Sequence, residues 1–254
     1  MNLLLVSATC HEVHRLIDTP GTRCISTGQF YSGSIGNVQV DFLITGVGIA
    51  AAAFQTGRHL TLKRYDLAIN AGIAGSFAPD PEPGTVVRVI EDCFADFGVD
   101  EGIRFVAPFT AGLADPDTLP FSDGRLIPTV YRISGQETGA GGPVGGIAIP
   151  ETGERHATGS STLDRLPGVK GTTTFTIRTR PSAIRQVMTY TGAAVETMEG
   201  AAFFYATISS GIPGIQIRAI SNMVGERDHS KWKTALAIQN LHETMTNFLT
   251  ELST

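Results

Sequence analysis

Residues 38–76 read VQVDFLITGVGIAAAAFQTGRHLTLKRYDLAINAGIAGS, and this stretch decides the fold class. It opens with an apolar segment at 38–45, continues with an alanine-rich segment at 49–64, and returns to an apolar segment at 66–71. The outer two segments have the composition of buried strands, and the middle one has the length and composition of a helix. A strand, a helix and a second strand in this order predict an α/β protein.

The rest of the chain repeats this alternation of short apolar runs, glycine-containing turns and helical stretches. Further strands are predicted at 2–8, 31–36, 84–91, 169–176, 193–196 and 214–220. A short helix or turn is expected at 12–18, a helix begins near Met198, and an amphipathic helix is expected at 229–252. No repeat, linker or change of composition divides the sequence, so we expect a single domain over residues 1–254.

The composition excludes several classes of function. The 254 residues include 19 Lys and Arg against 24 Asp and Glu, a formal net charge of −5, so nucleic acid is not an expected partner. The most apolar stretches, 42–54 and 67–78, are shorter than the ~20 residues that a membrane-spanning helix needs. No secretory signal is visible. The 3 cysteines are an odd number at unrelated spacings, which indicates reduced thiols and not a set of disulfides. We therefore expect a cytoplasmic enzyme with no membrane partner.

Glycine-rich sequences follow two successive strands of the opening stretch. The first, Gly46-Val47-Gly48, leads into the helix, where its backbone amides can face a ligand. The second, NAGIAG at 70–75, comes directly after the next strand. Small residues at two successive strand ends leave room at the carboxyl edge of the sheet, where open α/β sheets bind ligands. The candidate binding residues at this edge are Val47, Gly48 and Gly72.

The first glycine turn also fits a dinucleotide-binding pattern. Residues 46–51 match G-x-G-x-x-A, and Asp66 lies 20 residues beyond Gly46. Asp66 precedes its strand, however, whereas the acidic residue that binds a ribose should follow one. An NAD-dependent oxidoreductase remains an alternative on this pattern, as does a nucleoside-binding protein without catalytic activity.

Three polar side chains lie near predicted strand ends. Glu12 follows the first strand, Glu199 precedes an alanine-rich helix, and Asn222 follows the strand at 214–220. A carboxylate at a helix N-terminus or an asparagine cap would be a simpler explanation of Glu199 or Asn222 alone. No zinc spacing, Walker A loop or G-x-S-x-G motif occurs in the sequence, so neither a metal nor another cofactor is expected.

Taken together, these segments resemble the nucleoside phosphorylase and nucleosidase superfamily, in order and over nearly the whole chain. The matching motifs are Ala8 to Glu12-Val13, Thr45-Gly46-Val47-Gly48, Asn70-Ala71-Gly72-Ile73-Ala74-Gly75, Met198-Glu199-Gly200 and Arg218-Ala219-Ile220-Ser221-Asn222. The resemblance implies a three-layer αβα fold around a central twisted, partly closed mixed sheet. It also implies a homo-oligomer with the active site near a subunit interface.

Within the superfamily the chain resembles the futalosine hydrolases, nucleosidases of the alternative menaquinone pathway. The sequence Glu196-Thr197-Met198-Glu199-Gly200 and the amide of Asn222 point to them. The usual nucleosidase pattern is V-E-M-E, so Thr197 is one extra residue, and it leaves the role of Glu196 open. The alternatives are a 5′-methylthioadenosine/S-adenosylhomocysteine nucleosidase, an aminodeoxyfutalosine nucleosidase and a purine nucleoside phosphorylase.

The resemblance also implies a role for each site residue. Glu12 would take a proton from water as general base, and Glu199 would accept hydrogen bonds from the ribose hydroxyls. The remaining contacts would be Met198 to the sugar, Phe175 to the purine face and the Thr176 backbone to the base edge. Adenine-cleaving nucleosidases carry aspartate in place of Asn222. An amide there would accept from N7–H and donate to a 6-oxo group, which favours hypoxanthine. The N7 proton would then come from another source.

Three further features of the substrate site concern the second substrate, the 5′ group and the segment 135–159. A carboxylate at Glu12 would repel phosphate, so hydrolysis is favoured over phosphorolysis. The aromatic carboxylate on the 5′ side of futalosine would suit an arginine, for which Arg155 and Arg178 are candidates. The glycine-rich segment 135–159 has the composition of a surface loop, with an active-site lid as the alternative.

Overall fold

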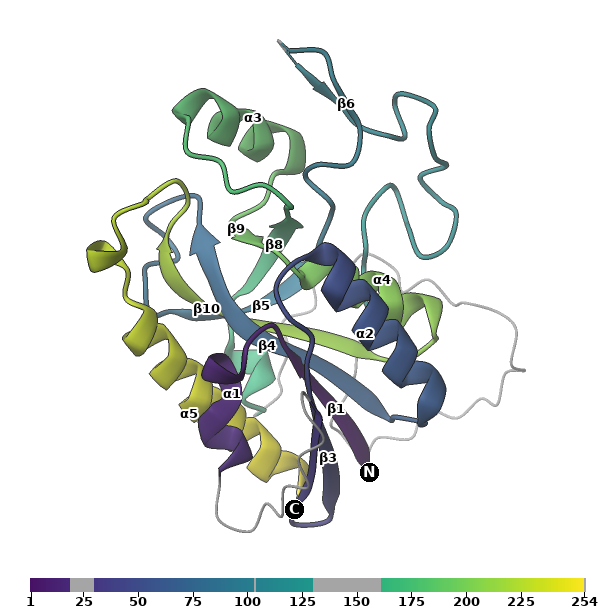
Figure 1. Cartoon of the computed structure of the whole chain (residues 1–254), viewed down its shortest axis with the longest axis vertical. Coiled ribbons are helices and arrows are strands. Elements are labelled where there is room, and N and C mark those ends of the chain that lie inside the picture. The colour runs from purple at the N-terminus through teal and green to yellow at the C-terminus, as the bar shows by residue number, and fades with distance from the viewer. Residues whose placement is uncertain (19–29, 103, 130–160, 254) are drawn as a thin grey trace.

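The computed structural model describes residues 1–18, 30–102, 104–129 and 161–253. Within them, an 8-stranded mixed sheet has the strand order β10-β5-β8-β9-β4-β1-β3-β2 (Figure 1). Its strands are β1 (Asn2–Ser7), β2 (Phe30–Ile35), β3 (Val38–Ile44), β4 (Leu67–Ser76), β5 (Val86–Glu91), β8 (Gly168–Thr173), β9 (Val195–Thr197) and β10 (Gly214–Met223). A separate hairpin pairs β6 (Val99–Asp100) with β7 (Phe105–Val106).

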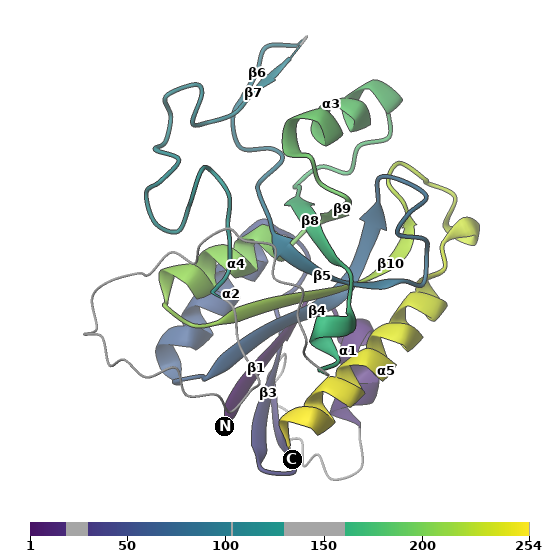
Figure 2. The same ribbon diagram turned by 180° about the vertical axis from the view of Figure 1, so that it is seen from behind.

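Helices cover both faces of this sheet, as the two opposite views show (Figures 1 and 2). On one face lie α1 (Cys10–Ile17) and α5 (Thr234–Leu252), and on the other lie α2 (Ile49–Leu62) and α4 (Gly200–Ser209). Alternate residues of each strand enter the two cores, since successive side chains of a strand point to opposite faces. Leu3 and Leu5 belong to the core that includes α5, and Leu4 and Val6 to the core that includes α4. This arrangement confirms the predicted three-layer αβα fold.

Part of the sheet closes on itself because β10 pairs with two strands. It lies parallel to β4 and antiparallel to β5, and β5 leads back to β4 through β8 and β9. This ring agrees with the partly closed mixed sheet that the resemblance implied. β1, β3, β4 and β10 run parallel to one another, so their carboxyl ends share one edge of the sheet, where ligands bind in α/β proteins.

Two of these parallel strands are longer than the sequence predicts. β4 extends to Ser76, so the NAGIAG sequence at 70–75 lies inside the strand and not after it. The small residues stay extended because β10 pairs with β4 along its whole second half, an example of tertiary pairing overriding weak β propensity. β10 itself continues to Met223, which places Asn222 within the strand and not beyond it.

The predicted boundaries also differ near the other site residues. β8 ends at Thr173 and not at 176, because the Asp96 carboxylate accepts hydrogen bonds from the backbone N–H groups of Phe175 and Thr176 and holds them in a turn. α4 begins at Gly200, which leaves Met198 outside the helix. The C-terminal helix is preceded by a short 3-10 turn, η2 (His229–Lys231). The segment 135–159, including Arg155, lies outside the described residues.

The remaining described helix, α3 (Pro181–Thr191), packs against a small apolar cluster formed by Phe77, Ala95 and Ala193. It lies with the β6–β7 hairpin beyond the ends of β8 and β9 (Figures 1 and 2). None of the helices in the described ranges is long and apolar enough to cross a membrane.

Candidate active site

Glu12 lies in the first turn of α1 and is almost fully buried. Its Oε2 accepts hydrogen bonds from the hydroxyl of Ser7 at 3.1 Å and from the backbone N–H and hydroxyl of Thr9, both at 2.9 Å. The contact to the Thr9 amide is one half of a capping box, so the start of the helix fixes the carboxylate. Its Oε1 accepts from the backbone N–H of Ile73 in β4 at 3.0 Å. Four donors therefore direct this acid toward β4.

Glu199 approaches Arg218 and Glu12 from the opposite layer. It is the N-cap residue of α4, and its Oε1 accepts a hydrogen bond from the backbone N–H of Gly48 at 2.9 Å. Gly48 has a φ of +101°, a conformation that favours glycine, and it starts α2. Burial raises the pKa of Glu199, and the nearby positive charge of Arg218 opposes this shift.

Arg218 connects the two acids electrostatically. It is fully buried on β10, and its Nη2 donates to the side-chain oxygen of Asn70 on β4. Burial lowers the pKa of Arg218, whereas the negative charges of Glu199, Glu12 and Asp92 raise it, in that order of size. The sequence motif contained this arginine without assigning it a role. An arginine inside a strand sequence at 215–220 that is apolar except for Gln216 is the signal that would have identified it.

Gly72 supplies the space in which these charges meet. A Cβ atom at this position would lie 2.6 Å from Nη1 of Arg218 and 2.7 Å from Oε1 of Glu12. Both distances are shorter than side-chain contacts allow, and both neighbours are buried. Gly72 is therefore required for the close approach of the acid and the guanidinium to β4.

Asn222 lies on the neighbouring strand, with its Cα paired with that of Gly75 in β4. Its Oδ1 accepts from the hydroxyl of Ser221 at 2.6 Å, and its Nδ2 donates to the carbonyl of Met223 at 2.9 Å. Each amide atom keeps one further hydrogen-bonding position, so the side chain can still present an acceptor and a donor together. Glu12 and Asn222 thus both lie beside the carboxyl half of β4, and Glu199 lies within electrostatic range of Glu12.

The other predicted site residues are held less tightly. Val47 and Phe175 are 59% and 57% exposed, and Met198 is half-buried beside Glu199. The backbone N–H of Thr176 already donates to Asp96 at 3.2 Å, so a base that bound this amide would replace that contact. The contacts of these four residues with a nucleoside stay predictions.

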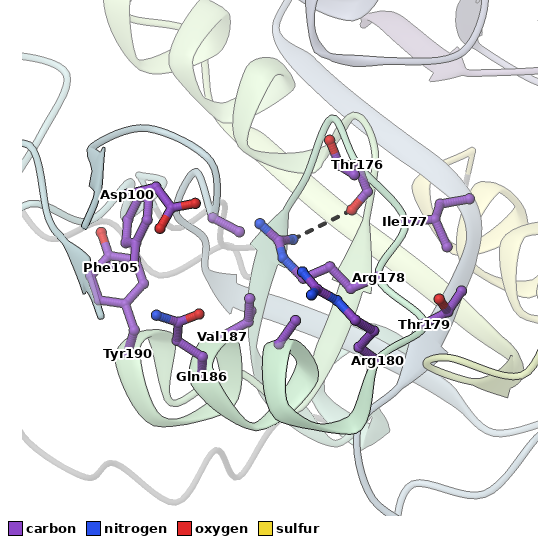
Figure 3. A pocket seen from close by; sticks show the side chains of 12 residues that line it. Asp100, Phe105, Thr176, Ile177, Arg178, Thr179, Arg180, Gln186, Val187 and Tyr190 are labelled. Carbon is purple, nitrogen blue, oxygen red and sulfur yellow. Dashed lines mark hydrogen bonds between the residues drawn. The ribbon is translucent and has the colours of Figure 1, made fainter. Parts of the chain in front are cut away.

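A cavity of about 280 Å³ lies between α3, the β6–β7 hairpin and the chain at 176–180 (Figure 3). Arg178 lines it, donates to the carbonyl of Thr176 at 3.4 Å, and forms an ion pair with Asp96. Its Nη1 also donates to the hydroxyl of Thr174 at 2.8 Å. The charge of Arg178 is therefore already balanced by a carboxylate, which weakens its candidacy as the partner of a substrate carboxylate.

The dinucleotide interpretation loses its second element in the structure. The Asp66 carboxylate accepts from the backbone N–H of Asn2 at 2.7 Å, at the amino end of β4. The glycine turn at Gly46 and Gly48 follows the carboxyl end of β3, which runs parallel to β4 through β1. The acid and the glycine turn consequently lie at opposite ends of the strands and cannot bind one cofactor as a Rossmann fingerprint does.

Comparison with known proteins agrees with this arrangement. Residues 2–252 match the phosphorylase superfamily. The futalosine hydrolase of Streptomyces coelicolor is 29% identical over 251 residues, which cover 95% of this chain and 92% of that protein. The futalosine hydrolase of Thermus thermophilus is 29% identical over 213 residues, covering 83% and 81%.

The fold has counterparts among solved structures as well. A 5′-methylthioadenosine/S-adenosylhomocysteine nucleosidase from Colwellia psychrerythraea, determined in complex with adenine, aligns with a TM-score of 0.72 at 20% identity. The alignment covers 99% of this chain and 96% of that one, so the two share the fold throughout. The protein is thus an enzyme of the nucleosidase type, which acts on N-glycosidic bonds. It belongs to the phosphorylase superfamily.

Proposed function

We propose that this enzyme hydrolyses futalosine to hypoxanthine and dehypoxanthine futalosine in the alternative menaquinone pathway. The observation that carries the proposal is the approach of Glu12 and Glu199 to the buried Arg218, which lies with Glu12 beside Gly72 of β4. The two futalosine hydrolases at 29% identity support this substrate over most of the chain.

The reaction sets three chemical tasks that match these residues. Cleavage of an N-glycosidic bond leaves positive charge on the sugar and negative charge on the base, while water must be activated. Glu12 takes a proton from the attacking water, and a general base of this kind contributes about 10²–10⁴-fold to the rate. Glu199 accepts hydrogen bonds from the ribose hydroxyls, and its charge stabilises the developing cation.

Arg218 positions the two acids and does not act on the base. Its charge offsets part of the repulsion that Glu12 exerts on Glu199, which would otherwise raise the pKa of Glu199 further. The Gly48 amide then orients Glu199 through the bond at 2.9 Å. The result is a pair of carboxylates held in fixed positions before substrate arrives, which is the condition for electrostatic stabilisation of a transition state.

Asn222 is the residue that selects the base. Its amide can accept from one ring N–H and donate to a 6-oxo group at the same time, whereas an ionised aspartate can only accept. This pattern fits hypoxanthine better than adenine. A site that must satisfy such a polar group discriminates by about 10⁴-fold or more against a base that leaves it unpaired.

Water is favoured over phosphate as the second substrate. A phosphate ion would meet the carboxylates of Glu12 and Glu199, and the buried guanidinium of Arg218 already faces three acids. Repulsion between these carboxylates and a phosphate ion would disfavour phosphate binding. Hydrolysis therefore needs only a water molecule beside Glu12.

Product analysis in phosphate-free buffer tests the proposal. The purified enzyme is incubated with futalosine, aminodeoxyfutalosine, inosine and methylthioadenosine, and released bases are measured by chromatography. We expect hypoxanthine from futalosine at the highest rate. Preferred release of adenine from methylthioadenosine would assign the enzyme to the other nucleosidase class, and strict dependence on added phosphate would make it a phosphorylase.

We also propose that the enzyme is a homo-oligomer, a dimer or a larger assembly. The support is a set of large apolar side chains on and beside α2, namely Val47, Phe54 and Leu62, which are 59%, 66% and 68% exposed. Val47 is next to Gly48, so an interface here would adjoin the nucleoside site. Light scattering after size exclusion should give at least twice the monomer mass, and a monomer at assay concentration would contradict the proposal.

A further inference from the structure

Glu196 lies in the same row of the sheet as Asn222. Its Cα pairs with that of Gly75 across β9 and β4, and Gly75 pairs on its other side with Asn222 of β10. Residues paired directly across neighbouring strands direct their side chains to the same face. Because the residue between them is glycine, Glu196 and Asn222 flank a position without a side chain. Two strand spacings of about 4.8 Å separate their backbones, so the two side chains could converge on one edge of a base.

The space beside Gly75 on this face is taken up by two neighbouring side chains. A Cβ atom there would lie 3.0 Å from Cγ2 of Val224 and 3.6 Å from Nδ2 of Asn222. The glycine therefore lets Val224 and the Asn222 amide pack close to β4. Glu196 pairs with Gly75 from β9, on the other side of β4 from Asn222.

The Glu196 carboxylate has little support as an anion. It is 9% exposed, and its Oε2 is buried with no hydrogen-bond partner among the residues that the structure describes. In the described part of the chain, the cation paired with it is Arg178, whose Nη1 lies 4.0 Å from Oε2. That guanidinium already forms an ion pair with Asp96 and donates to Thr174. A buried carboxylate without donors is stabilised by holding a proton.

We propose that Glu196 is the general acid that protonates the leaving base at N7. The inference rests on the proposed function and supplies what Asn222 lacks, since an amide has no proton to give. Glu196 delivers the proton to N7 while Asn222 donates to the neighbouring 6-oxo group, since both atoms lie on one edge of the purine. Burial raises the pKa of Glu196 to about 7, with Arg178 lowering it and Asp96 raising it, so the acid form is well populated near neutral pH.

The step balances in atoms and charge. The C1′–N9 bond breaks and its electron pair moves into the purine, while the Glu196 proton moves to N7. Water adds its oxygen to C1′ and gives its proton to Glu12. Hypoxanthine leaves in the N7–H form, and proton exchange with solvent restores Glu12 as carboxylate and Glu196 as acid. The net reaction consumes one water molecule and no other reagent.

Two substrates with different leaving groups separate this role from a structural one. Futalosine needs a proton on its base, whereas the nitrophenolate of 4-nitrophenyl β-D-ribofuranoside leaves without one. We expect Glu196→Gln to lower kcat for futalosine by about 10²- to 10⁴-fold, the usual contribution of a general acid, and to leave the nitrophenyl riboside rate within a few-fold of wild type. Glu91→Gln on β5 is the matched control. It removes a carboxylate that forms an ion pair with Lys170 of β8, and it should change neither rate.

The pH profile of the wild-type enzyme gives an independent test that needs no variant. For futalosine, kcat/KM should fall as the pH rises through about 7, because Glu196 loses its proton, and this fall should be absent for the nitrophenyl riboside. A variant that is equally slow on both substrates, or a fall that persists in Glu196→Gln, would overturn the assignment while leaving the hydrolase proposal intact. No base release by the wild-type enzyme from any nucleoside would instead overturn the proposed function.

Discussion

The backbone amide of Gly48 donates to the Glu199 carboxylate at 2.9 Å, which links the start of α2 to the start of α4 across 151 residues of sequence. The bond depends on both elements. The positive φ of Gly48 turns its N–H out of the strand direction, and the N-cap position holds Glu199 at the sheet edge. The acid that we propose to face the sugar is thus positioned by a glycine turn from the other half of the chain.

Replacing Glu199 by glutamine should separate its charge from its position. Glutamine retains an acceptor for the Gly48 amide but removes the negative charge beside the sugar. We expect kcat for futalosine to fall by about 10²–10³-fold, the range seen when one preorganised electrostatic contact is removed, with KM changed much less. Steady-state kinetics measure this effect. Glu243→Gln, an exposed change on α5, is the control, and an unchanged kcat in Glu199→Gln would remove Glu199 from the mechanism.

A methyl group at Gly72 should disturb both Glu12 and Arg218. In Gly72→Ala the new Cβ would lie within 2.7 Å of each of these buried side chains, so at least one must move. We expect loss of most activity and a lower free energy of unfolding, by about 1–3 kcal/mol as in other overpacked sites. Activity assays and urea unfolding check the two effects.

Gly57→Ala is a matched control for this substitution. Gly57 lies within α2, and a Cβ there meets nothing within 4 Å. Alanine is favoured over glycine in a helix by roughly 0.5–1 kcal/mol, so this variant should be more stable than wild type and fully active. Equal effects of the two substitutions would show that Gly72 is not a special position.

The fold could be predicted from sequence because its signals are local. The segments at 38–45, 49–64 and 66–71 form β3, α2 and the start of β4. The end of β4 could not be predicted, since its small residues have weak β propensity and stay extended only through pairing with β10.

The site was predictable to the extent that strand ends and family motifs indicate it. Glu12 and Glu199 follow from those signals. Those signals do not predict that Asp96 binds the Thr176 amide or that Glu196 and Asn222 lie in one row of the sheet. Both features depend on contacts between segments that are distant in sequence. The charge on Arg178 is balanced by Asp96 for the same reason, and no local pattern announces that ion pair.

Exchange of the Asn222 amide, which we propose to select the base, should change substrate preference. In Asn222→Asp the donor to the 6-oxo group becomes an acceptor, which suits the 6-amino group of adenine. We expect the ratio of kcat/KM for futalosine to that for aminodeoxyfutalosine to shift toward the amino substrate by at least tenfold. Both ratios are measured under identical conditions. The same ratio before and after the exchange would show that another residue selects the base.

Below neutral pH the folded state should lose stability through His242. This side chain is buried on α5, with its ring centroid 5.9 Å from that of His14 on α1. Burial lowers its pKa to about 4, and the charges of Arg15 and His14 lower it as well. Between pH 6.5 and 4 the unfolded chain therefore binds a proton that the folded chain does not, so the free energy of unfolding falls as the pH drops through this window.

A variant without this imidazole tests the role of His242. The free energy of unfolding should differ less between pH 7 and pH 5 in His242→Gln than in the wild type, by on the order of 1 kcal/mol. Urea unfolding of both proteins at the two pH values measures it, and parallel losses of stability would contradict the role of His242.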